Sequence, residues 1–167
     1  MKTLDEQLTN YACYHRSTRN IATHLVGIPM IVLAVVVLLS RPAWVVGDWP
    51  LSPAVVATAA ALAYYLRLDL RFGAIMAVLL ALSLGFGAWA AAQSTALWLA
   101  IGAGGFVLGW IVQFIGHHFE GRKPAFVDDL MGLLIGPLFV VAELLFLVGA
   151  FAGLKARIER QAGPQRA

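Results

Sequence analysis

The chain has 167 residues, of which 60% are hydrophobic and only 13% are charged, and its mean hydropathy is +0.80. A water-soluble domain of this length could not bury so much apolar surface, so the composition excludes an ordinary soluble protein and predicts an integral membrane protein. The net charge of +3 therefore bears on membrane orientation and not on a nucleic-acid partner.

The first 20 residues, MKTLDEQLTNYACYHRSTRN, form a polar N-terminal segment. They lack the apolar core and the small-residue cleavage site of a secretory signal peptide, so we expect the first apolar run to stay in the membrane. The segment contains the chain's one cysteine, Cys13, which excludes an internal disulfide and a CxxC metal motif. It also contains His15, one of four histidines in the chain.

Four apolar stretches follow, and a helix needs about 20 such residues to cross a bilayer. They lie at about 21–39, 53–66, 72–92 and 95–115. The second is short, and the charged segment RLDLR at 67–71 separates it from the third at a membrane face. A last apolar stretch covers about 130–154, and a basic tail covers 155–167. We predict an all-α bundle of membrane helices formed by one domain, residues 1–167.

The basic residues distinguish two topologies, because lysine and arginine concentrate in cytoplasmic loops. If the last stretch returns to its own side as a re-entrant segment or hairpin, eleven of the twelve basic residues share one face and Arg41 alone faces the other. If all five stretches span, the division is seven against five. We therefore expect about four full spans, a break at Gly136-Pro137 and both termini in the cytoplasm. Five spans are the alternative, and the membrane would be a bacterial inner membrane or the endoplasmic reticulum of a eukaryote.

The motif QFIGHHFE ends the fourth span and carries several polar groups. Gln113, His117 and Glu120 are spaced i, i+4 and i+7, so they share one helix face, whereas His118 lies about 100° away from it. The spacing suits one imidazole ligand with a carboxylate or amide as a second ligand or an orienting partner. Gly116 removes a side chain beside His117, so another helix or a ligand can approach. Taken alone, a histidine at a helix end more often meets water or lipid headgroups than a metal.

The motif YACYHRSTRNIATH at residues 11–24 supplies two more histidines. His15 and His24 are nine residues apart and would lie on opposite faces of one unbroken helix. A helix break with Ser17 or Thr18 as the N-cap would change this and allow one metal to take both. The alternative for His24 is a buried histidine that is satisfied by a backbone carbonyl. The first and fourth spans bring both motifs to one membrane face, so we expect the histidines to cluster there.

Further polar residues surround these motifs. Glu143 lies deep in the last apolar stretch, where a carboxyl group needs a partner, a proton or a cavity. Arg122 and Lys123 suit a lipid phosphate or a fatty-acid carboxylate, or they only set the topology. Asp128 is equally suited to cap the helix that follows. The candidates for contacts around the metal or with substrate are Tyr11, Asn20, Gln113, Arg122, Lys123, Asp128 and Glu143.

Imidazole and carboxylate ligands without a thiolate suit iron or zinc, and the residues alone do not choose between them. Open coordination positions beside three histidines would serve either oxygen activation or hydrolysis. A zinc-dependent membrane lipid hydrolase and a non-enzymatic protein that binds haem or lipid therefore remain as alternatives.

The two motifs together resemble a known family. The first pattern, QL..Y..YH....N...H..G.P, runs from Gln7 to Pro29, and the second, QF.GH followed by FE...PA..D, runs from Gln113 to Asp128. In this combination the chain resembles the fungal and bacterial membrane proteins that include the yeast 2-hydroxy fatty acid dioxygenase of phytosphingosine breakdown.

The resemblance implies an iron(II)-dependent dioxygenase of fatty-acid alpha-oxidation, which shortens a 2-hydroxy fatty acid by one carbon. It implies that His15, His24 and His117 bind one Fe2+. Glu120 is the catalytic candidate, either as a ligand or as a group that orients one, and we expect His118 to be a neighbour of the site. The partners would be the fatty acid, O2 and membrane lipids, with the acyl chain among the apolar spans.

Overall fold

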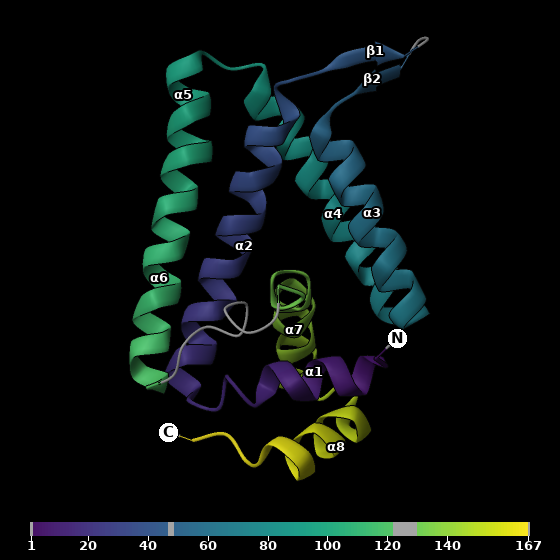
Figure 1. The fold of residues 1–167 in the computed structure, drawn as a ribbon, viewed down its shortest axis with the longest axis vertical. Coiled ribbons are helices and arrows are strands. Elements are labelled where there is room, and N and C mark those ends of the chain that lie inside the picture. Colours follow the sequence, from purple (N-terminus) through teal and green to yellow (C-terminus); the bar gives the residue numbers. More distant parts are fainter. Residues whose placement is uncertain (1, 47–48, 122–129, 167) are drawn as a thin grey trace. The chain divides into compact units, whose positions relative to one another are not determined.

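The structure is a computed structural model that describes residues 2–46, 49–121 and 130–166, with the backbone alone at 45–46 and 49–50. It confirms the predicted helical membrane fold (Figure 1). The elements are α1 (Leu4–Ala12), α2 (Thr18–Ser40), β1 (Trp44–Val46), β2 (Trp49–Leu51), α3 (Pro53–Leu68), α4 (Leu70–Ala91), α5 (Thr95–Leu99), the π-helix η1 (Ala100–Gly104), α6 (Gly105–Glu120), α7 (Gly132–Leu147) and α8 (Ala152–Ala162). The chain forms two compact units, Met1–Pro29 with Trp110–Ala167, and Met30–Gly109. A single membrane domain stays a prediction.

Among the described residues, three helices are long and apolar enough to cross a membrane. They are α2, α4 and the continuous helical segment Thr95–Glu120. The shorter α3 has 16 residues. At about 1.5 Å per residue it extends about 24 Å, against about 30 Å of hydrocarbon. The four expected spans therefore correspond to three helices of full length and one short helix.

The last apolar stretch has two parts, as expected, but its break is not where the sequence predicted it. Gly136 and Pro137 lie inside α7, so the predicted break there is wrong; the proline removes one N–H donor from a helix that continues past it. The bend of 116° lies between α7 and α8. There Gly149 has φ +78° and ends α7 in a Schellman motif, in which Ala150 N donates to Leu145 O and Gly149 N to Phe146 O.

In the unit Met30–Gly109, α3 and α4 form a tight antiparallel pair. Asp69 ends α3 and caps α4, because its Oδ1 accepts from Arg71 N at 2.8 Å and Phe72 N at 2.9 Å. A Cβ at Gly73 would lie 2.8 Å from Leu66 Cα, so only glycine allows this close approach. The charged segment RLDLR is thus the turn of a helical hairpin. The strands β1 and β2 form a second, short hairpin, in which Trp44 pairs with Leu51.

In the other unit, α1 packs against α7 and α8. A capping box starts α1, since Glu6 N donates to Thr3 Oγ1 and Thr3 N donates to the Glu6 carboxylate. The amphipathic α8 buries Leu154 and Ile158, and its Arg157 pairs with Asp5 of α1. These contacts bring the C-terminal helix to the N-terminal segment.

This arrangement predicts that both termini are accessible from the same side of the membrane. The reason is that Arg166 contacts Arg16, ahead of α2, and Glu120, at the end of α6. Epitope tags at either end should be digested by protease from that side only. A tag inserted between β1 and β2, at the other end of α2, is the control and should be protected. A C-terminal tag on the side opposite the N-terminal tag would contradict this topology.

Candidate metal centre

A break in the chain brings His15 and His24 together. Residues 13–17 separate α1 from α2, so the two histidines do not sit on one helix and need not face in opposite directions. Their ring centroids are 4.4 Å apart. The helix break that one metal site for both histidines would require is therefore present.

His117, near the end of α6, completes a cluster of three histidines. Its ring centroid lies 5.1 Å from that of His15 and 4.9 Å from that of His24. One nitrogen of each ring lies within 4.8 Å of the other two, and all three side chains are buried. A metal ion with bonds of about 2.1 Å holds its nitrogen ligands within about 4.2 Å of one another, so shifts of less than about 1 Å would let the rings bind one ion. The next residue, His118, is exposed.

Backbone carbonyls orient two of the rings. His15 Nδ1 donates to Tyr11 O at 2.7 Å, and His24 Nδ1 donates to Asn20 O at 2.8 Å, each one helical turn earlier. A carbonyl only accepts, so Nδ1 carries the proton and Nε2 carries the lone pair. The hydrogen bond from His24 to the Asn20 carbonyl is therefore compatible with metal binding, since the hydrogen bond uses Nδ1 and a metal ion would bind Nε2.

The second ring nitrogen of His15, Nε2, is buried without a hydrogen bond from the described residues. Burial lowers the pKa of His15 to about 3, so its imidazole is neutral at pH 7. A neutral imidazole whose other nitrogen is held by a carbonyl is the form that binds metal ions.

Aromatic rings cover one side of His15. Tyr11 stacks on it with centroids 4.2 Å apart and an interplanar angle of 6°. Phe139 of α7 contacts both rings, at 4.9 Å from Tyr11 and 5.8 Å from His15. Burial raises the pKa of Tyr11, so its phenol stays protonated. The sequence did not indicate Phe139, because one phenylalanine in an apolar helix carries no signal of its own.

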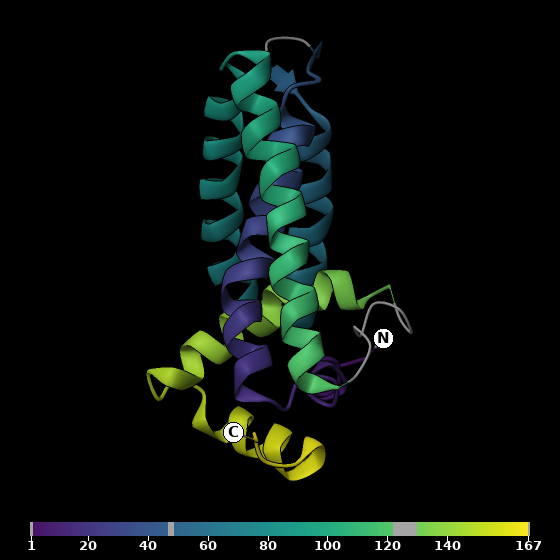
Figure 2. The same cartoon turned by 90° about the vertical axis from the view of Figure 1, so that its left-hand side faces the viewer.

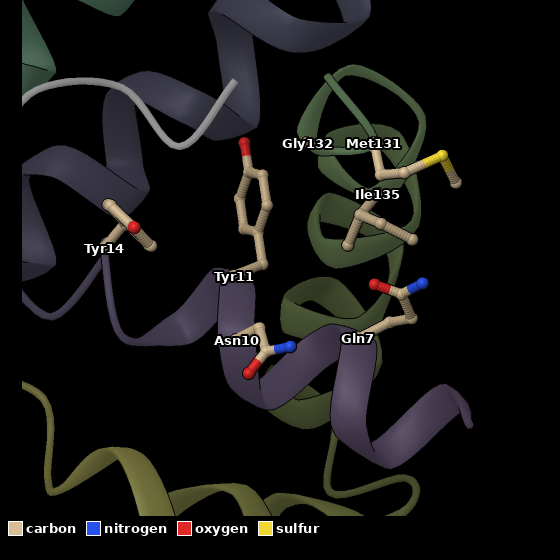
Figure 3. A pocket seen from close by; sticks show the side chains of 7 residues that line it. All are labelled: Gln7, Asn10, Tyr11, Tyr14, Met131, Gly132 and Ile135. Atoms are coloured by element: carbon tan, nitrogen blue, oxygen red, sulfur yellow. The ribbon is translucent and has the colours of Figure 1, made fainter. Parts of the chain in front are cut away.

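Tyr11 also lines a pocket of about 50 Å³ between α1 and the start of α7 (Figure 3). Figure 3 shows its ring between Tyr14 on one side and Ile135 on the other. Sites for whole drug-sized ligands measure about 300 Å³ or more, so this pocket has room for a head group and not for an acyl chain. The lining residues are Gln7, Asn10, Tyr11, Tyr14, Met131, Gly132 and Ile135.

Glu120 joins the turn after His15 to the helix that carries His117. Its Oε2 accepts from Arg16 N at 3.0 Å, from Ser17 N at 2.8 Å and from Asn20 Nδ2 at 2.9 Å. Its Oε1 accepts from Arg166 at 2.8 Å, and the Glu120 side chain has no exposed surface. Both oxygens are therefore engaged in holding protein groups in place.

Two other expected residues are also buried. Gln113 lies one turn before His117 and is 3% exposed, and neither polar atom of its amide has a hydrogen-bond partner in the part of the chain that the structure describes. Glu143 of α7 accepts from Gln165 Nε2 at 3.0 Å, which supplies the partner that its position required. The sequence did not indicate Gln165 or Arg166, since a basic tail mainly suggests topology.

Three predicted residues, Arg122, Lys123 and Asp128, lie outside the described residues.

Comparison with known proteins identifies the family. The family described as "2-hydroxy-palmitic acid dioxygenase Mpo1-like" matches residues 1–148. The chain is also 32% identical over 158 residues to the 2-hydroxy-palmitic acid dioxygenase MPO1 of Saccharomyces cerevisiae, a match that covers 93% of this chain and 87% of the yeast protein. The chain belongs to the Mpo1-like family. No solved structure matches it. All three histidines of the cluster lie in the part that matches the Mpo1-like family, whereas α8 and the residues after it do not.

Gly116 lets two helices of this Mpo1-like chain approach closely beside the cluster. A Cβ at this position would lie 2.0 Å from Thr23 Oγ1 and 2.6 Å from Asn20 Oδ1, both on α2. The expected close approach is confirmed. Figure 2 shows α2 and α6 side by side in this unit.

Replacement of Gly116 by alanine should therefore separate α6 from α2. We expect Gly116→Ala to lower the free energy of unfolding by about 1–3 kcal/mol, the usual cost of overpacking, and to reduce metal binding because His117 moves away from His24. Thermal unfolding in detergent and metal analysis measure both effects. Gly85→Ala is the matched control, since a Cβ there meets nothing within 4 Å and alanine favours a helix by about 1 kcal/mol. Equal stability of the two variants would contradict the close approach.

Proposed function

We propose that this protein is an Fe(II)-dependent dioxygenase of fatty-acid alpha-oxidation that shortens a 2-hydroxy fatty acid by one carbon. The observation that most supports it is the convergence of three buried histidines within the region that matches the Mpo1-like family. The name of the yeast relative supplies the substrate class. The apolar helices supply the surroundings that an acyl chain requires.

His15, His24 and His117 would hold the ion. A buried nitrogen without a partner is rare in native proteins, and a metal ion would satisfy His15 Nε2. Three imidazoles without a thiolate suit iron or zinc. Iron fits the proposed reaction because Fe(II) supplies the one-electron chemistry that O2 requires, whereas zinc has no redox chemistry.

The overall reaction balances with O2 as the only co-substrate. Oxidation of C2 to a carboxyl group and loss of C1 as carbon dioxide remove four electrons from the 2-hydroxy acid. Reduction of one O2 takes up four electrons, so no further reductant is required. The products are the acid with one carbon fewer, carbon dioxide and water.

The chain's own residues would bind and orient the substrate. The amide of Gln113 lies one turn from His117, and it can donate to a carboxylate and accept from the 2-hydroxyl group. The protonated phenol of Tyr11 offers a further donor beside the pocket. Glu120 acts here as a positioning residue, since its oxygens hold the turn that follows His15.

Several predicted features stay proposals. They are a catalytic role of Glu120 in addition to its positioning of the turn, a contact of Arg122 or Lys123 with the substrate carboxylate, a role for Asp128 near the site, and cytoplasmic termini in a bacterial inner membrane or in the endoplasmic reticulum.

Removal of any one histidine of the cluster should abolish both metal binding and turnover. We expect His15→Ala, His24→Ala and His117→Ala each to weaken iron binding by more than about 100-fold, because loss of an outer partner alone costs 10–100-fold. His118→Ala is the control and should keep both properties, since His118 is exposed. Anaerobically purified protein is analysed for metal. It is then incubated with 2-hydroxypalmitic acid, Fe(II) and O2, and the product is examined for the acid one carbon shorter.

Full iron occupancy and activity in all three alanine variants would refute the site. Retained zinc with turnover in the absence of O2 would favour the hydrolase instead. A haem Soret band would favour a haem-binding protein.

Gln113→Leu separates a functional amide from a structural one. The change removes a buried amide that has no hydrogen-bond partner among the described residues, so stability should be equal or higher. Turnover measured as kcat/KM should fall about tenfold, which corresponds to the loss of about one hydrogen bond to the substrate. Gln93→Leu, two residues after the end of α4, is the control and should leave turnover unchanged, because Gln93 lies in the other compact unit of the chain. Lower stability with unchanged turnover would show that Gln113 is structural.

A further inference from the structure

The last described residues, Gly163–Arg166, follow α8 and bind the segment between His15 and α2, and we term them the C-terminal strap (Figure 1). Arg166 N donates to Arg16 O at 2.7 Å, and Thr18 N donates to Arg166 O at 2.8 Å. Arg166 thus pairs with Ser17 as in a short parallel ladder. The strap therefore holds the segment that connects His15 to α2.

The strap also supplies a donor to each of two buried carboxylates. Arg166 donates to Glu120 Oε1 at 2.8 Å, and the neighbouring Gln165 donates to Glu143 Oε2 at 3.0 Å. Glu120 and Glu143 are both buried and come from different helices, α6 and α7. A buried carboxylate is costly without a partner, so docking of the strap and burial of these two groups depend on each other.

Helix α8 determines where the strap lies. It is anchored on α1 by the Asp5–Arg157 pair and by the buried side chains of Leu154 and Ile158. The strap and α8 follow residue 148, where the match to the Mpo1-like family ends.

We infer that the strap is a positioning device of the metal site, in which Arg166 sets the place of His15 relative to His117 and thereby the metal affinity. The inference rests on the proposed metal-binding function. His15 is bonded to Arg16, whose N–H is held by Glu120 and whose carbonyl is held by the strap. Loss of Arg166 removes the cation from Glu120, and loss of the whole strap also frees the carbonyl of Arg16. Arg166 touches Glu120 and the turn, so it acts through them on the ligand histidines.

The test measures metal affinity apart from turnover. Metal-free protein in detergent is titrated with Co(II), and binding is followed by visible absorption and by the rise in melting temperature. We expect Arg166→Gln, and a chain that ends at Ala162, to bind Co(II) about tenfold or more weakly, the usual effect of losing an outer partner of a metal ligand. Arg166→Lys should restore most of the affinity, because an ammonium group still donates to Glu120. Arg160→Gln removes the same charge from an exposed position of α8 and should bind as the unaltered protein does.

Each outcome decides the inference. Unchanged Co(II) affinity in Arg166→Gln with a lower melting temperature would make the strap a structural clamp only and would overturn the inference, while the proposed function would stand. If the shortened chain does not fold, the pair Arg166→Gln and Arg166→Lys decides alone. If the unaltered protein binds neither Co(II) nor Fe(II), the proposed function fails and the inference fails with it.

Discussion

The arrangement of the three histidines depends on the buried carboxylate of Glu120. This group lies one turn after His117 and accepts from the backbone of Arg16 and Ser17, which follow His15. It also accepts from the side-chain amide of Asn20. The backbone carbonyl oxygen of the same residue accepts from His24 Nδ1 and orients that ring. The carboxylate at the end of α6 is thus hydrogen-bonded to the segment between His15 and His24. An anion is favoured at this position because it lies at the N-terminal end of α2, where the N–H groups of Arg16 and Ser17 donate to it.

The polar groups of this unit divide into those satisfied within the protein and those left for a ligand. Carbonyl oxygens hold Nδ1 of His15 and of His24, and protein donors surround Glu120 and Glu143. Buried polar atoms without a hydrogen bond in the described part of the chain include His15 Nε2, Arg16 Nη2, Asn20 Oδ1 and both polar atoms of the Gln113 amide. The hydrogen-bonded groups hold the geometry of the cluster, whereas His15 Nε2 and the amide of Gln113, which lie on the histidine cluster or one turn from it, are the unsatisfied groups placed to bind a ligand.

Membrane insertion explains why this polar network lies at helix ends. Charged groups at the centre of a bilayer are costly, so His117 and Glu120 end the apolar segment that begins at Thr95, and His24 lies within two turns of the start of α2. The polar α1, the amphipathic α8 and the strap then cover these ends. The site therefore lies where apolar helices, suited to an acyl chain, meet polar segments suited to a carboxylate and a metal.

The sequence by itself determined the membrane class and the helical spans, which follow from composition and local spacing, and the family resemblance of its two motifs singled out the three histidines. It placed the break of the last stretch wrongly at Gly136-Pro137, since a proline marks a weak point in a helix but only the Schellman motif at Gly149 ends α7. The cluster of histidines was expected, but only the tertiary structure decided that Glu120 holds the turn before α2 and that Gln165 and Arg166 pair with Glu143 and Glu120. These contacts join residues separated by up to 104 positions, and no local pattern encodes a partner at that distance.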